Sequence, residues 1–173
     1  MPFYNVTDSG DSIPVQNYRM SYLRQSSRVW DRILRDNRLA PLEDRDGFEG
    51  YIESRSLARD VITHRNDKMV FNFINDQRPY FNAPDYIMVN FMNRECRTMS
   101  AAAALASKFS LPVLYLRMMH KEDGRGYYIE HVTITEDASK MAVEDIIKQY
   151  YRLLEADIRQ QPENYLWTHN RWG

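Results

Sequence analysis

Three consecutive polar residues, Asp76, Gln77 and Arg78, stand just after a short apolar run at residues 69–74. Polar residues bound this run on both sides, which is typical of a buried strand. Loops that follow the strands of an α/β sheet commonly contact ligands. We therefore treat Asp76, Gln77 and Arg78 as candidate substrate-binding residues. A polar turn without a ligand is the alternative.

Basic side chains recur at two further places where an anionic partner could bind. The arginines between residues 24 and 35 are three or four positions apart, so they face one way on a helix. An acidic carrier protein or an anionic lipid can use such a stripe, and a solvated helix face is the alternative. His169 and Arg171 either meet an anionic head group or hold the end of the chain in place. The stripe consists of Arg24, Arg28, Arg32 and Arg35.

The composition excludes several kinds of site. The chain has 173 residues, enough for one domain, and its formal net charge of −1 argues against a nucleic-acid binder driven by bulk charge. Cys96 is the only cysteine, which excludes an internal disulfide and a cysteine-based zinc site. No apolar run is long enough to span a membrane, and the N-terminus lacks a signal-peptide pattern. We expect a soluble globular chain without a Gly-rich phosphate loop, a metal-ligand cluster or a serine-nucleophile motif.

The hydrophobic pattern switches between helical and strand periods along the chain. Residues 1–17 are turn-rich and irregular, and we expect residues 18–173 to form a single α/β domain. Asp46 or Gly47 should cap the second helix. The order of elements predicts a mixed β-sheet flanked by helices. Helices are predicted at 26–37, at 48–65, from Thr98 or Ser100 to about Phe109 and from 141 onward, and strands at 69–74, 86–91, 111–116 and 127–135.

The last dozen residues, 161–172, follow the long amphipathic segment. Pro162 cannot continue a helix without the loss of a backbone hydrogen bond, so this helix should end near Gln161. Three aromatic residues come next, each with a large apolar area and a polar handle. We predict that they pin the tail into a crevice between helix and sheet, because aromatic clusters are more often core than ligand sites. They are Tyr165, Trp167 and Trp172.

The segment from Pro162 to Trp172 resembles the Pro-Glu-Gln-Tyr-x-Trp-x-His-Arg-Arg-Phe ending of the bacterial lipid A biosynthesis (lauroyl/myristoyl) acyltransferases, which belong to the lysophospholipid acyltransferase superfamily. Other blocks of the family occur in the same order from about residue 15 to residue 172. The chain departs from the family at Met20, at Met92–Asn93 and at Asn170, where Pro, Gly and Arg are usual. The similar blocks are Asn17–Arg19, Ser27–Arg32, Val70–Gln77, Val89–Phe91, Arg97–Thr98 and Leu111–Leu114.

The resemblance implies the glycerolipid acyltransferase fold, with its N-terminal part missing from this chain. It implies transfer of a fatty acyl group from an acyl-carrier protein or acyl-CoA thioester to a hydroxyl of a lipid A-type glycolipid, without a metal or redox cofactor. It also implies a cytoplasmic protein peripheral to the inner membrane, and we expect no nucleic-acid partner. Arg19 resembles a family arginine that helps to hold phosphate or the developing anion. A surface salt bridge is the alternative for Arg19.

The catalytic pair of the family is a His followed five positions later by Asp or Glu, and it would precede Met1 here. In that pair the His is the base and the carboxylate orients it. His131 and Glu136 match the spacing. Such matches arise by chance, and positions five apart in the predicted strand point to opposite faces. We therefore assign no catalytic residue and expect the chain alone to be inactive. A non-catalytic lipid- or partner-binding module derived from the same fold is the alternative.

Overall fold

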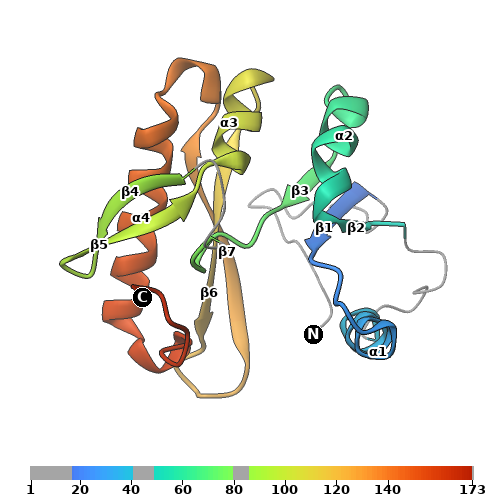
Figure 1. Cartoon of the computed structure of the whole chain (residues 1–173). Helices are drawn as coiled ribbons and strands as arrows, with labels where there is room; N and C mark the ends of the chain where they lie inside the picture. Colours follow the sequence, from blue (N-terminus) through green and yellow to red (C-terminus); the bar gives the residue numbers. More distant parts are fainter. Residues whose placement is uncertain (1–16, 41–48, 80–85, 173) are drawn as a thin grey trace. The chain divides into compact units, whose positions relative to one another are not determined.

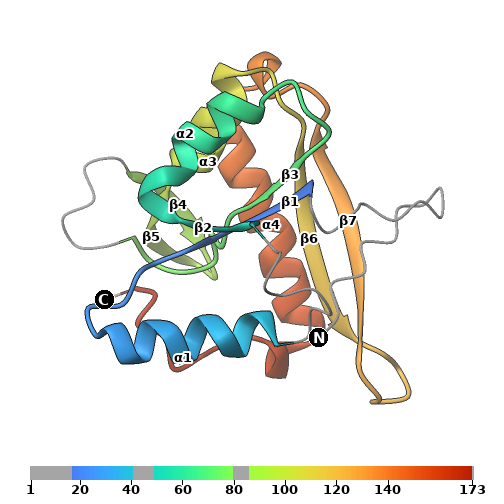
Figure 2. The same cartoon turned by 90° about the vertical axis from the view of Figure 1, so that its right-hand side faces the viewer.

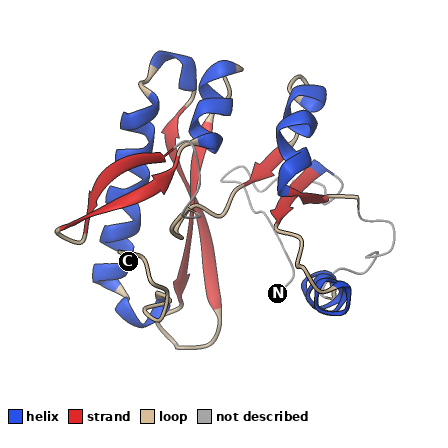
Figure 3. Ribbon diagram, viewed as in Figure 1, coloured by secondary structure: helices blue, strands red, loops and turns tan. Residues whose placement is uncertain are grey.

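The structure, a computed structural model, describes residues 17–40, 49–79 and 86–172. The chain divides into two compact units, unit 1 (Met1–Phe73) and unit 2 (Ile74–Gly173). Helices and strands alternate in both units (Figures 1 and 3). The predicted α/β class is therefore confirmed, and the single domain over residues 18–173 stays a prediction. The irregular segment 1–17 and the caps Asp46 and Gly47 fall almost wholly outside the described residues.

Unit 1 is built around a short parallel sheet in which β1 lies between β2 and β3. Its buried side chains among the described residues come from β1 and from both helices. The side-chain oxygen of Ser27 accepts a hydrogen bond from the Trp30 amide, so this serine caps the first helix. The elements are β1 (Tyr18–Tyr22), α1 (Arg28–Leu39), β2 (Tyr51–Glu53), α2 (Ser54–His64) and β3 (Val70–Asn72).

Two strands of unit 1 were not predicted from the sequence. β1 and β2 have five and three residues, and they are strands because they pair with one another and with β3. This pairing joins positions far apart in the sequence, which no local period reveals. The predicted helix at 48–65 is therefore wrong at its beginning, since Tyr51–Glu53 pairs with β1 and α2 begins at Ser54.

Unit 2 packs two antiparallel hairpins and a short helix against one long helix. α4 contacts β4, β6, β7 and α3 (Figure 1). Its buried residues among those described form a core with the inward side chains of the β4–β5 hairpin and with alanines of α3. The elements are β4 (Tyr86–Phe91), β5 (Arg94–Met99), α3 (Ala101–Lys108), β6 (Val113–His120), β7 (Tyr127–Thr135) and α4 (Val143–Gln160).

The strand β5 was also missed, and the turn before it contains one of the departures from the family. Met92 and Asn93 join β4 to β5, with φ angles of 53° and 61°. A two-residue hairpin turn needs this left-handed conformation, which glycine adopts most freely. The Met92 amide donates to Glu155 Oε2 of α4 at 3.0 Å, which holds the turn in place. Ser100, at the start of α3, makes no side-chain cap bond, so the predicted capping is not observed.

Parallel and antiparallel strand pairs both occur, but the described strands form three separate small sheets rather than one mixed sheet. The long helix ends at Gln160, with Gln161 as its C-cap, as Pro162 predicts. No described helix combines the length and the apolar character that crossing a bilayer requires.

Candidate functional site

The loop at residues 74–79 carries the three predicted substrate-binding residues. The loop is fixed to α4, because the Tyr151 hydroxyl donates a hydrogen bond of 2.9 Å to the carbonyl oxygen of Asn75. Gln77 is exposed to solvent and Arg78 is half-buried. The structure thus brings Asp76, Gln77 and Arg78 together on an anchored loop after β3, as predicted. Their contact with a substrate stays a prediction.

Asp76 differs from its two neighbours because one of its carboxylate oxygens is buried. Oδ1 has no hydrogen-bond partner among the described residues. Burial raises the pKa of four tyrosines near it, and the charge of Asp76 raises each of them further. A buried oxygen without a partner lowers stability, which proteins tolerate mainly where function requires the group. The four tyrosines are Tyr115, Tyr150, Tyr151 and Tyr165.

Arg171 is the most deeply buried charged residue among those described, with 1% of its surface exposed. One terminal nitrogen donates to the carbonyl oxygen of Arg97 in β5 at 2.6 Å, and the other donates to the Tyr151 hydroxyl. The guanidinium carbon lies 5.1 Å from the centre of the Tyr151 ring and 5.9 Å from that of Phe91. Nε has no partner among the described residues. Of the two alternatives for Arg171, the structure shows the one in which it holds the tail.

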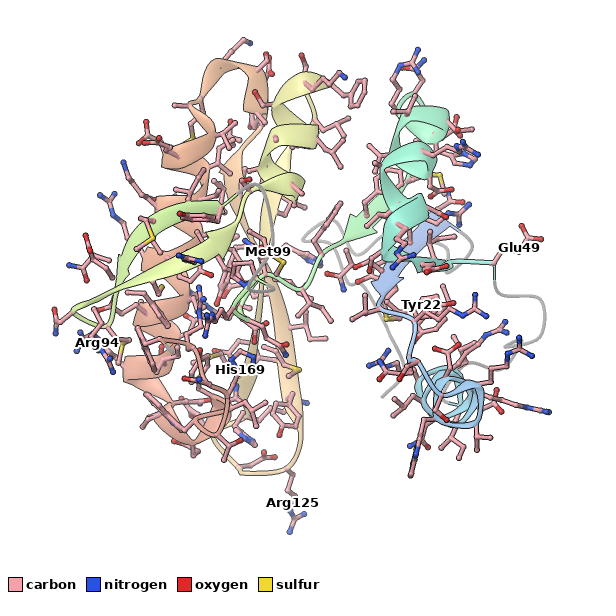
Figure 4. The ribbon with its side chains drawn as sticks, viewed as in Figure 1. Tyr22, Glu49, Arg94, Met99, Arg125 and His169 are labelled. Carbon is pink, nitrogen blue, oxygen red and sulfur yellow. The ribbon has the colours of Figure 1, made fainter. Side chains whose placement is uncertain are left out.

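The aromatic residues of the tail pack as predicted, with one exception. Trp172 stacks on Phe91 with ring centres 5.8 Å apart, and its indole nitrogen donates to the Phe91 carbonyl oxygen. Tyr165 meets the same ring edge-on at 6.3 Å. Trp167 is 49% exposed and contacts Tyr165, so it does not reach the core. The tail therefore closes over the β4–β5 hairpin and α4. His169, which Figure 4 labels, belongs to this tail and is half-buried.

Tyr151 connects the tail to the loop at 74–79. Its hydroxyl accepts from Arg171 and donates to Asn75, so the single hydroxyl hydrogen is used in the second bond. Burial raises the pKa of Tyr151 to about 12, although the charge of Arg171 acts to lower it. The hydroxyl therefore stays neutral at physiological pH and serves as a structural link.

We expect the stability of the chain to fall as the pH rises above about 10. The pKa of a tyrosine is near 10 in the unfolded chain and about 12 for Tyr151 in the folded chain. The stability that this difference contributes is complete below pH 10 and is lost as the pH rises from 10 to 12. Tyr151→Phe should flatten this fall by up to about 1.4 kcal/mol per pH unit between those values. Urea unfolding in steps of pH measures the slope. Equal slopes in Tyr151→Phe and in the exposed control Tyr128→Phe contradict the prediction.

Arg19, the fourth predicted binding residue, lies in β1 of unit 1, whereas the loop at 74–79 belongs to unit 2. Its Nε lies 3.2 Å from Oδ2 of Asp60 in α2, and both side chains are largely buried. Asp60 Oδ1 also lies 3.6 Å from Nε2 of His64. The salt bridge that we named as the alternative is therefore present, though it is partly buried. A role in holding phosphate stays a prediction.

A second buried ionic group fastens the β6–β7 hairpin to α4. Asp157 of α4 is 8% exposed and accepts from the Tyr115 hydroxyl and from Nε of Arg117, each at 2.8 Å. Arg117 also donates to Glu130 on the neighbouring strand at 2.9 Å. Because every one of these groups has a partner inside unit 2, this cluster is a structural fastening.

His131 and Glu136 have the spacing of the family pair but not a useful geometry. His131 lies within β7, opposite Leu116 of β6, and Glu136 is exposed beyond the end of the strand. Among the described residues no hydrogen bond or ion pair joins the two side chains. The predicted strand at 127–135 is confirmed, which supports the rejection of this pair as catalytic. In the part of the chain that the structure describes, no cluster of His, Cys, Asp or Glu could hold a metal ion.

Sequence reasoning did not single out Tyr151 or Asp157. Both lie on α4, and Asp157 stands beside the apolar positions Leu154 and Ile158. An acidic residue on an otherwise apolar helix face is a usable signal for a buried partner, since buried charges are normally paired. Tyr151 gives no comparable signal, because tyrosine is common both in cores and on surfaces.

Residues 42–173, about three quarters of the chain, match the family described as "Bacterial lipid A biosynthesis acyltransferase". The match includes the loop at 74–79, the β4–β5 hairpin and the tail, and it leaves out β1 and α1. No curated protein matches the chain.

Proposed function

Because the chain belongs to the bacterial lipid A biosynthesis acyltransferase family, we propose that it takes part in a fatty acyl transfer reaction. In this reaction the acyl group moves from an acyl-carrier protein or acyl-CoA thioester to a hydroxyl of a lipid A-type glycolipid precursor. The family itself supports acyltransferase activity in general. The donor, the acceptor and a location peripheral to the cytoplasmic face of the inner membrane are parts of the proposal.

The observation that carries the proposal is the anchored loop at 74–79. Its backbone is tied through Tyr151 to the buried Arg171 of the family-like tail. A site that must hold a head group in register needs such rigid support behind the contacting side chains. In our proposal Arg78 binds a phosphate or carbonyl oxygen of the glycolipid, and Gln77 adds a hydrogen bond. Arg19 belongs to the proposal separately, as an arginine of unit 1 that contacts an anionic group while its Nε pairs with Asp60.

We assign binding groups but no base for the acceptor hydroxyl to the described residues. His131 and Glu136 are the one sequence match to the family pair, and their strand geometry does not place them together. We therefore propose that this chain on its own has no acyl-transfer activity. The same observation supports the second candidate function, a non-catalytic module that binds lipid or a protein partner with the same loop residues.

Binding of a lipid A-type precursor to the chain tests the proposed site. Arg78→Ala should weaken binding at least about fivefold, because it removes a charge-assisted hydrogen bond. Gln77→Ala should weaken it less. Arg125→Ala is the matched control, because Arg125 lies at the tip of the β6–β7 hairpin and points away from unit 2 (Figure 4). Equal affinities in Arg78→Ala and Arg125→Ala would reject the site.

The same preparation tests the absence of turnover. With acyl-carrier thioester and precursor present, the chain alone should release no acylated product. Turnover that is abolished by His131→Ala would overturn this expectation and make His131 the base. Precursor binding without turnover agrees with both candidate functions, whereas acylated product in the same assay favours the enzyme over the module.

A further inference from the structure

Helix α1 exposes a stripe of large apolar side chains that no described residue of unit 1 covers. Val29, Trp30 and Ile33 are 67%, 61% and 46% exposed. Side chains advance by about 100° per residue around a helix, so Val29 and Ile33 lie about 40° apart and Trp30 lies next to them. We call these three residues the α1 apolar stripe. Figure 2 shows the helix along its length.

The opposite side of the helix is the one that unit 1 holds. Leu39 is 4% exposed, and Nη1 of Arg38 donates to the Tyr51 hydroxyl of β2. Asp31, also on this side, accepts from the Gln25 amide at 2.8 Å. The α1 apolar stripe lies on the side of the helix away from Leu39 and from the Arg38–Tyr51 contact.

Arginines accompany the stripe. Arg28 and Arg32 are exposed and lie one turn apart on the polar side of α1, about 100° and 60° around the helix from Val29, and the side chain of Arg32 is 85% exposed. Residues 23–39 contain five arginines and two aspartates, a net charge of +3 in a chain whose net charge is −1. One of the two aspartates, Asp36, lies 3.7 Å from Arg32. Positive charge is thus concentrated on the polar side of the helix that carries the exposed apolar residues.

The combination of exposed apolar residues and arginines on α1 favours one kind of partner over another. An acidic protein would use the arginines, but it would need an apolar patch of its own to cover the three large apolar side chains on the other side of the helix. The surface of an anionic bilayer uses both, because apolar side chains enter the acyl boundary while guanidiniums stay at the phosphates. Tryptophan is also favoured at that depth. We propose that α1 lies on anionic phospholipid bilayers, with Val29, Trp30 and Ile33 inserted and with Arg28 and Arg32 at the lipid phosphates.

This proposal rests on the peripheral location given under the proposed function and names the element responsible for it. Co-sedimentation of the chain with vesicles of phosphatidylcholine, with or without about 30% phosphatidylglycerol, tests it without any acyl donor or acceptor. Failure to bind these vesicles would therefore overturn the role of α1 without any consequence for the proposed acyl transfer. Failure of acyl transfer would likewise have no consequence for the vesicle-binding result.

We expect the chain to bind the anionic vesicles at least about tenfold more tightly than the neutral ones. Val29→Ser/Ile33→Ser should weaken this binding about tenfold, and Arg28→Glu/Arg32→Glu should weaken it at least as much. Ile62→Ser is the matched apolar control, since Ile62 of α2 is 42% exposed. Arg55→Glu/Arg59→Glu, on the exposed surface of α2, is the matched charge control. Both controls should stay within about twofold of the parent.

A second readout reports insertion directly. Lipids brominated on their acyl chains should quench the tryptophan fluorescence of the parent, and Trp30→Phe should remove most of the quenching while Trp167 and Trp172 remain. Vesicle binding that is unchanged in Val29→Ser/Ile33→Ser would overturn the proposal. A second result would also overturn it: weak binding to vesicles together with tight binding to an acidic carrier protein. If Arg28→Glu/Arg32→Glu abolished the binding to that protein, the surface would be assigned to the protein.

Discussion

Replacement of Arg171 by alanine should lower the free energy of unfolding by about 3–5 kcal/mol. The guanidinium is 1% exposed, and its loss removes the donors that serve the Arg97 carbonyl oxygen and the Tyr151 hydroxyl. Truncation also opens a cavity against the Phe91 ring. Urea unfolding followed by circular dichroism measures the change.

Two further variants test whether this loss of stability comes from the contacts of the Arg171 guanidinium. Arg171→Lys keeps the charge but cannot form the fork that reaches both oxygens, so we expect it to lose most of the same stability. Arg159→Ala is the surface control, because Arg159 is 55% exposed and pairs with Glu155 one turn earlier on α4. It should cost no more than about 0.5 kcal/mol. A loss below about 1 kcal/mol in Arg171→Ala would show that the tail is not held by this side chain.

Loss of the Arg171 side chain also affects the loop at 74–79. Tyr151 loses one of its two hydroxyl partners in Arg171→Ala and keeps only the Asn75 carbonyl oxygen. The loop that carries Asp76, Gln77 and Arg78 is then less firmly positioned. The tail therefore supports the proposed binding loop from behind, which is a physical reason for a family-like motif that lies outside the loop itself.

The sequence predicted the elements whose pattern is long or strongly periodic. The strand at 127–135, the strand at 86–91 and the end of the long helix before Pro162 agree with the structure. β5 was missed because Arg94, Glu95 and Arg97 mask the alternation that buries Cys96 and Thr98. A hydrophobic count alone does not find a strand whose exposed residues are charged.

The candidate site was only partly predictable for a related reason. The loop at 74–79 could be located because it follows an apolar run, which is a local signal. The pairing of Arg19 with Asp60 joins residues 41 positions apart, and that of Arg171 with the Arg97 carbonyl spans 74 positions. Sequence reasoning treats an arginine as a surface residue by default. The burial of Arg171 depends on aromatic rings and carbonyl groups that only the fold brings around it.

Phe91→Ala should also cost about 3–5 kcal/mol, because Phe91 is fully buried at the centre of the aromatic cluster of unit 2. Its ring meets Tyr151 at 5.2 Å, Trp172 at 5.8 Å and Tyr165 at 6.3 Å between ring centres. Phe91→Leu retains most of the apolar volume and should cost about 1–2 kcal/mol. Met88→Ala, on the same strand but 46% exposed, should cost less than about 1 kcal/mol. Urea unfolding measures all three.

A double-mutant cycle with Trp172→Ala shows whether this loss comes from the docking of the tail. Since the two rings stack, with planes 14° apart, the double variant should lose about 0.5–1.5 kcal/mol less than the sum of the single variants. Strictly additive losses would mean that Phe91 stabilises the β4–β5 hairpin and α4 independently of the tail. Coupling of the expected size means that the Phe91 ring joins the tail to the β4–β5 hairpin, and through Tyr151 to the long helix that holds the loop at 74–79.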